Sequence, residues 1–298
     1  MLGFQKRWDT DGGRVLDRLA RMFGRGRRRY VERIELHVSH ACNLACESCS
    51  HYSNHAHKGH LAPQTAAQWM APWSRRLAVD ELSLLGGEPT INPQLCDLIR
   101  IARRHFPRTR IRLITNGFFL DRHPDLGRTL VDVGNSYLAM SIHHDAADYR
   151  ARIAPALAQL ETWRRDHGLD VVFWDSHANW TRRYHGFGDG MLPFEDGRPR
   201  QSWETCLAKH CKQLHEGKLW KCAPLAYLGM QDAKFQLSEK WRPYLAYQPL
   251  APDCTDDELD AFLAREEDPQ CAMCSAELRP FALPNPLRRP TQTAEAAE

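Results

Sequence analysis

The stretch His40-Ala-Cys42-Asn-Leu-Ala-Cys46-Glu-Ser-Cys49 places three cysteines at C-x3-C-x2-C spacing directly after an apolar segment, Ile34 to Ser39, that reads as a strand. Loops that follow the strands of α/β folds carry much of their chemistry. Thiolates are soft ligands that suit iron–sulfur clusters and zinc, and three of them would leave one iron of a four-iron cubane without a protein ligand. By itself, this spacing also fits a three-cysteine zinc site or three unrelated buried thiols.

The segments that follow this loop alternate between short apolar runs and amphipathic stretches up to about residue 175, which indicates β-α-β units around a parallel sheet. One helix is predicted from Asn92 as N-cap, with Pro93 at its first position, to Pro107. Another carries Ile153, Leu157 and Leu160 and stops at Gly168. The pattern fits a doubly wound sheet or a partial (β/α) barrel. The predicted strands are Ile34 to Ser39, Glu81 to Leu85, Ile111 to Ile114, Leu138 to Ile142 and Val171 to Trp174.

The chain changes character after residue 175. Residues 180–200 are rich in Gly, Pro, Arg and aromatics and read as irregular connecting chain. A hairpin is predicted around Glu216-Gly217, and Thr255 with Glu258 forms a capping box that opens a helix. From about Pro280 the composition predicts a mobile tail.

Bulk composition narrows the class of protein. The net charge of +3 is small for 298 residues, so no global field favours nucleic acid or an anionic membrane as partner. The basic run Arg25 to Arg29 reads as a solvated surface arm. Because no apolar run is long enough to span a bilayer and the N-terminus lacks a secretory apolar core, we expect a cytoplasmic protein. Ten cysteines in a chain of this length then indicate metal binding in a reducing compartment.

Two further motifs accompany the cysteine run in chain order. Gly86-Gly87-Glu88-Pro89 follows the second predicted strand and Thr115-Asn116-Gly117 follows the third. With these companions the chain resembles the radical S-adenosylmethionine (SAM) superfamily, which implies a partial (β/α)6 barrel of the TIM type. The resemblance implies that Cys42, Cys46 and Cys49 hold a SAM-binding 4Fe-4S cluster.

The same resemblance implies the contacts to SAM. The open iron takes the amino and carboxylate groups of the methionine part of SAM, and the segment from Gly86 to Pro89 meets its amino end. Glycines let backbone groups approach a ligand closely. The other cofactor-binding residues expected are Thr115, Asn116, Ser141 and His143. Ser48 departs from the family pattern, because an aromatic or bulky residue usually precedes the third cysteine there.

A second group of cysteines lies downstream. It resembles the auxiliary-cluster module of some radical SAM enzymes, called a twitch or SPASM-like domain, which implies a second 4Fe-4S cluster. A complete set of four protein ligands would suit electron transfer better than substrate binding. The same thiolates would also suit a zinc ribbon, and Cys211 is an alternative to Cys206. The expected ligands are Cys206, Cys222, Cys271 and Cys274.

Histidines and acids supply candidates for proton transfer. His143, His144 and Asp175 follow the fourth and fifth predicted strands and are the expected catalytic residues. His51, His55, His57 and His60 match no helix-face metal pair and read as hydrogen-bonding or solvated loop histidines. The segment from Asp175 to Tyr184 mixes aromatic and polar groups, as a sugar or polyol substrate requires, and reads equally as a packing loop.

The expected organisation has four parts, given by residue number: 1–30, a basic extension; 31–200, the barrel; 201–279, the auxiliary module; and 280–298, a disordered tail. The resemblance implies an oxidoreductase that removes hydrogen from a small-molecule substrate, a carbohydrate or aminocyclitol, with a flavodoxin- or ferredoxin-type electron donor. A maturase of ribosomally made peptides is the alternative within the family, although we identify no separate leader-peptide domain. A zinc-stabilised binding protein is the alternative from another class.

Overall fold

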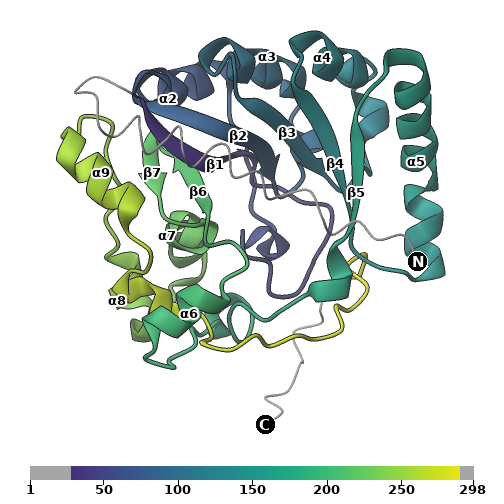
Figure 1. Ribbon diagram of the computed structural model, residues 1–298. Coiled ribbons are helices and arrows are strands. Elements are labelled where there is room, and N and C mark those ends of the chain that lie inside the picture. Colours follow the sequence, from purple (N-terminus) through teal and green to yellow (C-terminus); the bar gives the residue numbers. More distant parts are fainter. Residues whose placement is uncertain (1–27, 289–298) are drawn as a thin grey trace.

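A computed structural model describes residues 28–288 of the chain. Its centre is an open seven-stranded sheet in the order β5-β4-β3-β2-β1-β6-β7, with helices packed along one face (Figure 1). Neighbouring strands are parallel except for the pair β6 and β7. The strands are β1 (Arg29–Ser39), β2 (Leu77–Gly86), β3 (Arg110–Thr115), β4 (Ser136–Ile142), β5 (Val171–Asp175), β6 (Cys211–His215) and β7 (Lys218–Trp220).

The helices of the first half connect consecutive strands, as the alternating pattern predicted. Helices α2 to α5 cover the outer face of the sheet, and α6 to α9 belong to the second half (Figure 1). The helices are α2 (Pro63–Arg76), α3 (Leu95–His105), α4 (Leu126–Val133), α5 (Ala147–His167), α6 (Pro199–Thr205), α7 (Ala223–Phe235), α8 (Arg242–Leu245) and α9 (Asp256–Ala264).

The two faces of the sheet differ in chemistry. On β1, Ile34, Leu36 and Val38 are fully buried in the main core. The alternate residues on β1, Glu35 and His37 among them, point to the opposite face, because successive strand side chains alternate. These inner positions are polar on several neighbouring strands, so the inner face is suited to a ligand rather than to an apolar core.

The five strands predicted in the first half are confirmed. A sixth parallel strand is also present, but it comes from the second half of the chain and pairs with β1, where Glu35 lies opposite Gln213. The predicted hairpin joins β6 to β7, with Glu216 and Gly217 both at positive φ (52° and 73°), as a two-residue hairpin turn requires. The second half of the chain is therefore part of the central sheet.

Two of the predicted helix ends are confirmed and one is wrong. Gly168 is the left-handed C-cap of α5, and Thr255 with Glu258 forms the capping box of α9. The prediction of Asn92 as N-cap is wrong, because α3 begins at Leu95. The Asn92 side chain instead donates to the backbone oxygens of Val38 and Leu61 and accepts from Gln94 N.

The prediction of a mobile tail from Pro280 is wrong for residues 280–288. Leu283 is buried in the main core, and Pro286 O accepts a hydrogen bond at 2.9 Å from the backbone N of Ala45, which immediately precedes Cys46. Asn285 donates to the Asp148 carboxylate at 2.8 Å. The rest of the predicted tail, and nearly all of the predicted basic extension, lie outside the described residues. Among residues 28–288, none of the helices has the length and apolar character needed to cross a bilayer.

Candidate active site

A cavity of about 260 Å³ opens where β1, β2, β3 and β4 end, on the inner face of the sheet. It brings together the three motif segments that the sequence singled out. The lining residues from those segments and from the end of β4 are Cys42, Cys46, Cys49, Gly86, Gly87, Glu88, Thr115, Asn116, Ser141 and His143.

The glycines of the second motif fit against the cysteine loop. Gly87 N donates to Ser39 O and Glu88 N donates to Ala41 O, both at 2.8 Å. A Cβ on Gly87 would lie 2.3 Å from Ala41 O, far inside contact distance. Glycine is required here because the two loops run backbone against backbone.

Replacing Gly87 with alanine is therefore expected to destabilise the fold, by roughly 1–3 kcal/mol for forced overpacking. Gly190→Ala is the matched control, because a Cβ there would meet no atom within 4 Å. Thermal unfolding of the two variants beside the natural chain measures the difference. Equal midpoints for Gly87→Ala and Gly190→Ala would show that the loop relaxes without cost.

Glu88 links the second and third motifs. Its carboxylate is buried and accepts hydrogen bonds from Thr115 Oγ1 at 2.5 Å, Asn116 N at 2.8 Å and Thr90 N at 3.0 Å. Burial raises the pKa of this carboxyl group. Glu88 thus connects the loop that follows β2 to the loop that follows β3. The adjacent Pro89, which was expected to bind the cofactor, is buried in a short 3-10 turn and is not among the residues that line the cavity.

His143 and Ser141 form the wall next to Cys46. His143 Nδ1 lies 3.6 Å from Cys46 Sγ and Nε2 lies 3.1 Å from Ser141 Oγ. Burial lowers the pKa of His143 to about 4, so the imidazole is neutral at neutral pH. Its place beside a candidate cluster ligand fits the expected role in the cofactor site.

The other two expected catalytic residues lie outside the cavity. His144 Nδ1 accepts a hydrogen bond from Ala146 N at 2.9 Å and so supports the start of α5. Asp175 is exposed and is not among the lining residues, whereas its strand neighbour Trp174 is. Alternation along β5 turns Trp174 and Asp175 in opposite directions. The role of both residues in proton transfer stays a prediction, and neither is among the residues that line this cavity.

Several lining residues were not expected from the sequence, notably Glu35 and Trp174, whereas Trp180 belongs to the aromatic and polar segment predicted as a substrate or packing loop. His51 also lines the cavity, whereas His55 and His57 are buried beside Tyr184 and Gln231 as hydrogen-bonding groups. The available signal for Glu35 was the alternation of Glu35, His37 and Ser39 with the apolar residues of the same strand, because buried polar side chains need polar partners on their face of the sheet.

The comparisons with known proteins agree with the motifs. Residues 36–167 match the family model described as the Radical SAM superfamily. They form a radical SAM domain. Such a domain takes a 4Fe-4S cluster and SAM as cofactors.

Two curated relatives match over 120 residues each. A probable GTP 3',8-cyclase of Saccharolobus solfataricus is 27% identical over 40% of this chain and 37% of its own length. A GTP 3',8-cyclase of Chlorobaculum tepidum is 29% identical over 38% of this chain and 33% of its own length. The chain therefore spans about a third of the length of these relatives.

Solved structures with similar folds include BtrN in complex with AdoMet and 2-DOIA. It is 16% identical with a TM-score of 0.42, over 73% of this chain and 87% of that one. SuiB of Streptococcus suis bound to S-adenosylmethionine is 13% identical with a TM-score of 0.34, over 72% of this chain and 66% of that one.

The three cysteine thiols of the radical SAM domain are suitable ligands for a 4Fe-4S cluster. Burial raises the pKa of Cys42 and Cys46, whereas for Cys49 the contacts with His51 and with backbone N–H groups together outweigh burial and lower the pKa. Among the described residues, no three His, Cys, Asp or Glu side chains are arranged to hold a single metal ion. In a cubane each thiolate binds a different iron, so its ligands surround a cavity as Cys42, Cys46 and Cys49 do.

Ser48, which departs from the family pattern, turns away from the cavity. It has a positive φ of 59°, and its Oγ accepts a hydrogen bond from Arg183 N at 2.5 Å. Trp180, from the same later segment, donates from Nε1 to Glu47 O at 2.7 Å and lines the cavity edge-on to His143 at 5.8 Å. An aromatic ring is thus supplied to the radical SAM site by the segment that Ser48 anchors.

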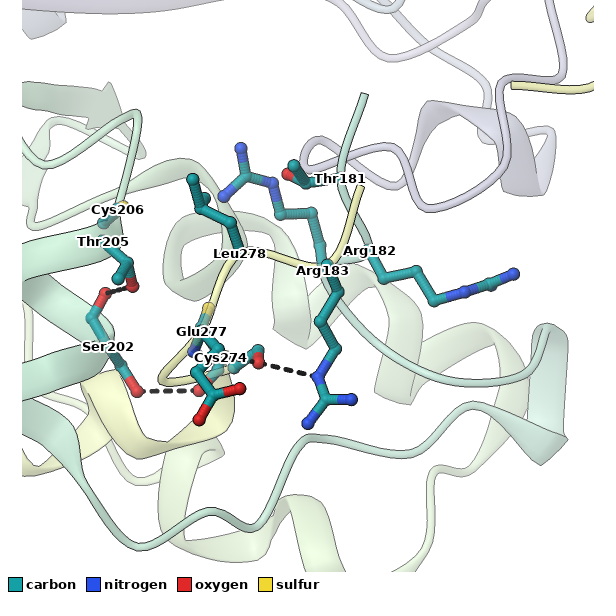
Figure 2. A pocket seen from close by; sticks show the side chains of 11 residues that line it. Thr181, Arg182, Arg183, Ser202, Thr205, Cys206, Cys274, Glu277 and Leu278 are labelled. Carbon is teal, nitrogen blue, oxygen red and sulfur yellow. Dashed lines mark hydrogen bonds between the residues drawn. The ribbon is translucent and has the colours of Figure 1, made fainter. Parts of the chain in front are cut away.

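The second cysteine group gathers at loops of the second half. Burial raises the pKa of Cys222, and the nearby thiolates of Cys274, Cys206 and Cys271 raise it further. Cys206 and Cys274 also border a small pocket with Arg182 and Arg183 (Figure 2). The four expected auxiliary ligands are therefore neighbours.

Cys211 does not share that neighbourhood. It lies on β6, where its thiol is 3.5 Å from Arg33 Nη1 and where burial, followed by the charge of Glu35, raises its pKa to about 12. Cys254 contacts Arg76 Nη1 at 3.1 Å in another part of the fold. Cys206 is the better fourth member of the group.

Tyr52 lies between the two groups. Its side chain is fully buried, and burial raises its pKa together with the charges of Cys274, Cys222 and Cys49. Its ring is 5.5 Å from that of Tyr184. The buried pair Tyr52 and Tyr184 therefore lies close to cysteines of both groups, within a core cluster against which Cys222 and Cys274 pack.

Proposed function

We propose that this protein is a radical SAM oxidoreductase that removes a hydrogen atom from a small polar substrate, a carbohydrate or an aminocyclitol. The observation that carries the proposal is the single cavity in which the cysteine loop, the Gly-Gly-Glu loop and the Thr-Asn loop meet. When bound, the cluster and SAM supply the 5'-deoxyadenosyl radical that abstracts hydrogen.

The residues that line the cavity have two proposed functions, which are to bind the cofactors and to bind the substrate. Cys42, Cys46 and Cys49 hold the cluster at one end, and the backbone of Gly86 and Gly87 receives the amino end of SAM. Ser141 and His143 form the wall beside it. The remaining lining residues include Glu35, His51 and Trp174, a charged and aromatic set suited to a polar ring compound.

The second cysteine group supports the redox character of the proposal. Cys206, Cys222, Cys271 and Cys274 are proposed as ligands of an auxiliary 4Fe-4S cluster. Oxidation of an alcohol carbon removes two electrons, one with the abstracted hydrogen atom and one with loss of a proton. A fully ligated cluster can accept an electron without binding substrate. A flavodoxin- or ferredoxin-type protein would supply the electron that starts the reaction.

Anaerobic reconstitution followed by iron, sulfide and product analysis tests the proposal. We expect about eight irons per chain, with matching labile sulfide. With dithionite, SAM and polyols deuterated at carbon, 5'-deoxyadenosine should form and carry deuterium. Bound zinc without labile sulfide would support the zinc-stabilised binding protein instead. Deuterium transfer from a labelled precursor peptide, and from none of the polyols, would support the peptide maturase.

A further inference from the structure

The inner face of the sheet carries a second charged cluster beyond the cysteine loop, and one member reaches the cavity. Glu35 is only 6% exposed, yet it lines the cavity. Gln213 Nε2 donates to its Oε2 at 2.6 Å, whereas Arg112 Nη2 is 3.8 Å from Oε1. Despite burial, the contacts of its neighbours lower the pKa of Glu35 to about 2. The cavity therefore contains a carboxylate that is ionised at neutral pH.

His51 faces this carboxylate across a gap. His51 Nε2 is a buried atom that has no hydrogen-bond partner within residues 28–288, and it lies 3.9 Å from Glu35 Oε2. That separation is too long for a hydrogen bond. One oxygen placed beside the pair can reach both atoms at about 2.8 Å. A hydroxyl group suits the place because it can donate to Glu35 and accept from His51.

Trp174 supplies an apolar face in the same cavity. Its side chain is 40% exposed, and the Arg112 guanidinium lies 5.2 Å from the centre of its ring. Arg112 is itself held by Glu81 at 3.1 Å and by Ser83 Oγ at 3.0 Å. The indole is thus backed by a fixed cation, and its exposed surface can pack against the C–H face of a ring polyol.

We propose that Glu35 and His51 together bind one hydroxyl group of the substrate, an unphosphorylated ring polyol that packs against Trp174. The carboxylate sets this class, because it accepts hydrogen bonds from hydroxyl groups, whereas an ionised phosphate group has no hydrogen to donate to it. This inference rests on the proposed function, since it names the substrate class of the same cavity.

Asp97 provides a control outside the site. It is exposed on the outer helix α3 and pairs with Arg100 Nη1 at 3.0 Å. It is not among the residues that line the cavity. Asp97→Asn therefore removes a carboxylate without changing the cavity wall or the residues that hold Arg112.

Calorimetric titration of the anaerobically reconstituted, SAM-loaded protein tests the proposal. The probes are myo-inositol, scyllo-inositol, glucose and 2-deoxystreptamine at millimolar concentrations, with glucose 6-phosphate as the anionic comparison. We expect at least one neutral or amino polyol to bind more tightly than the phosphate ester. Glu35→Gln and His51→Gln should each weaken that binding about tenfold or more, because each removes or alters a hydrogen bond involving a charged group. Asp97→Asn should leave it within about twofold.

Two results would overturn the proposal: no probe binds the SAM-loaded protein, or a probe binds and both Glu35→Gln and His51→Gln bind it as the natural chain does. Retained iron, sulfide and thermal midpoint show that the variants are folded. Failure of the proposed function is seen separately, as zinc in place of labile sulfide or as the absence of SAM binding. If the proposed function fails in this way but a polyol still binds and Glu35→Gln weakens its binding, the proposal that Glu35 and His51 bind a hydroxyl group is still supported.

Discussion

Replacing Cys49 with alanine is expected to abolish the formation of 5'-deoxyadenosine from SAM and dithionite. Removing one of three ligands leaves the cubane with two protein thiolates, so the cluster that binds SAM is lost. Liquid chromatography with mass spectrometry measures the product. The expected loss is to the background of protein-free assays, because Cys42, Cys46 and Cys49 are the cysteines that line the cavity where the Gly-Gly-Glu and Thr-Asn loops meet.

The control for this experiment is Cys96→Ala. Cys96 is partly buried on α3, where it packs against the main core. It lines neither the cavity of the radical SAM site nor the small pocket beside Cys206 and Cys274. This variant should keep its iron content and its product yield. Product formation by Cys49→Ala at the rate of Cys96→Ala would contradict the assignment of Cys49.

Cys206→Ala is expected to reduce the iron content of the reconstituted protein by about half, from about eight to about four per chain. Cys211→Ala should leave it unchanged. The reason is that Cys206 lies near the other three cysteines, since its charge raises the pKa of Cys222, Cys271 and Cys274. Cys211 lies instead beside Arg33 and Glu35 on β6. Iron and sulfide analysis of both variants decides between the two thiols.

The two variants also report on function in different ways. Cys206→Ala should still cleave SAM, because the first cluster keeps all of its proposed ligands, but it should lose oxidised product. If iron falls in Cys211→Ala and not in Cys206→Ala, the arrangement of the second cysteine group proposed above is wrong. If iron is unchanged in both variants, there is no auxiliary cluster at these residues.

Local signals in the chain were sufficient for most secondary structure. β-Branched and apolar runs located all five strands of the first half, and Gly168 and the Thr255 capping box marked two helix ends correctly. The exception, Asn92, shows the limit of such signals. Its side chain is used to join β1 to the following loop, a contact between segments about thirty and fifty residues away in sequence.

The expected cofactor residues were predicted well where they belong to contiguous motifs. Gly86, Gly87, Glu88, Thr115 and Asn116 all line the cavity. Glu88 has a further role that its motif did not indicate, because its carboxylate binds the backbone and side chains of two other loops. The sequence could not show that His144 and Asp175 are absent from the lining of this cavity, because the direction of a side chain at a strand end depends on register and pleat.

The sequence by itself indicated the kind of site to expect once the cysteine run was read together with the motifs Gly86 to Pro89 and Thr115 to Gly117, because each of these is a local property of one loop. What it left undecided was which distant residues complete that site. The pairing of β6 with β1 brings Gln213 to Glu35, places Cys211 away from the other downstream cysteines and makes the second half of the chain part of the sheet. Such contacts depend on long-range strand pairing, whose free energy comes from burial and hydrogen bonding across the whole fold rather than from any short stretch of sequence.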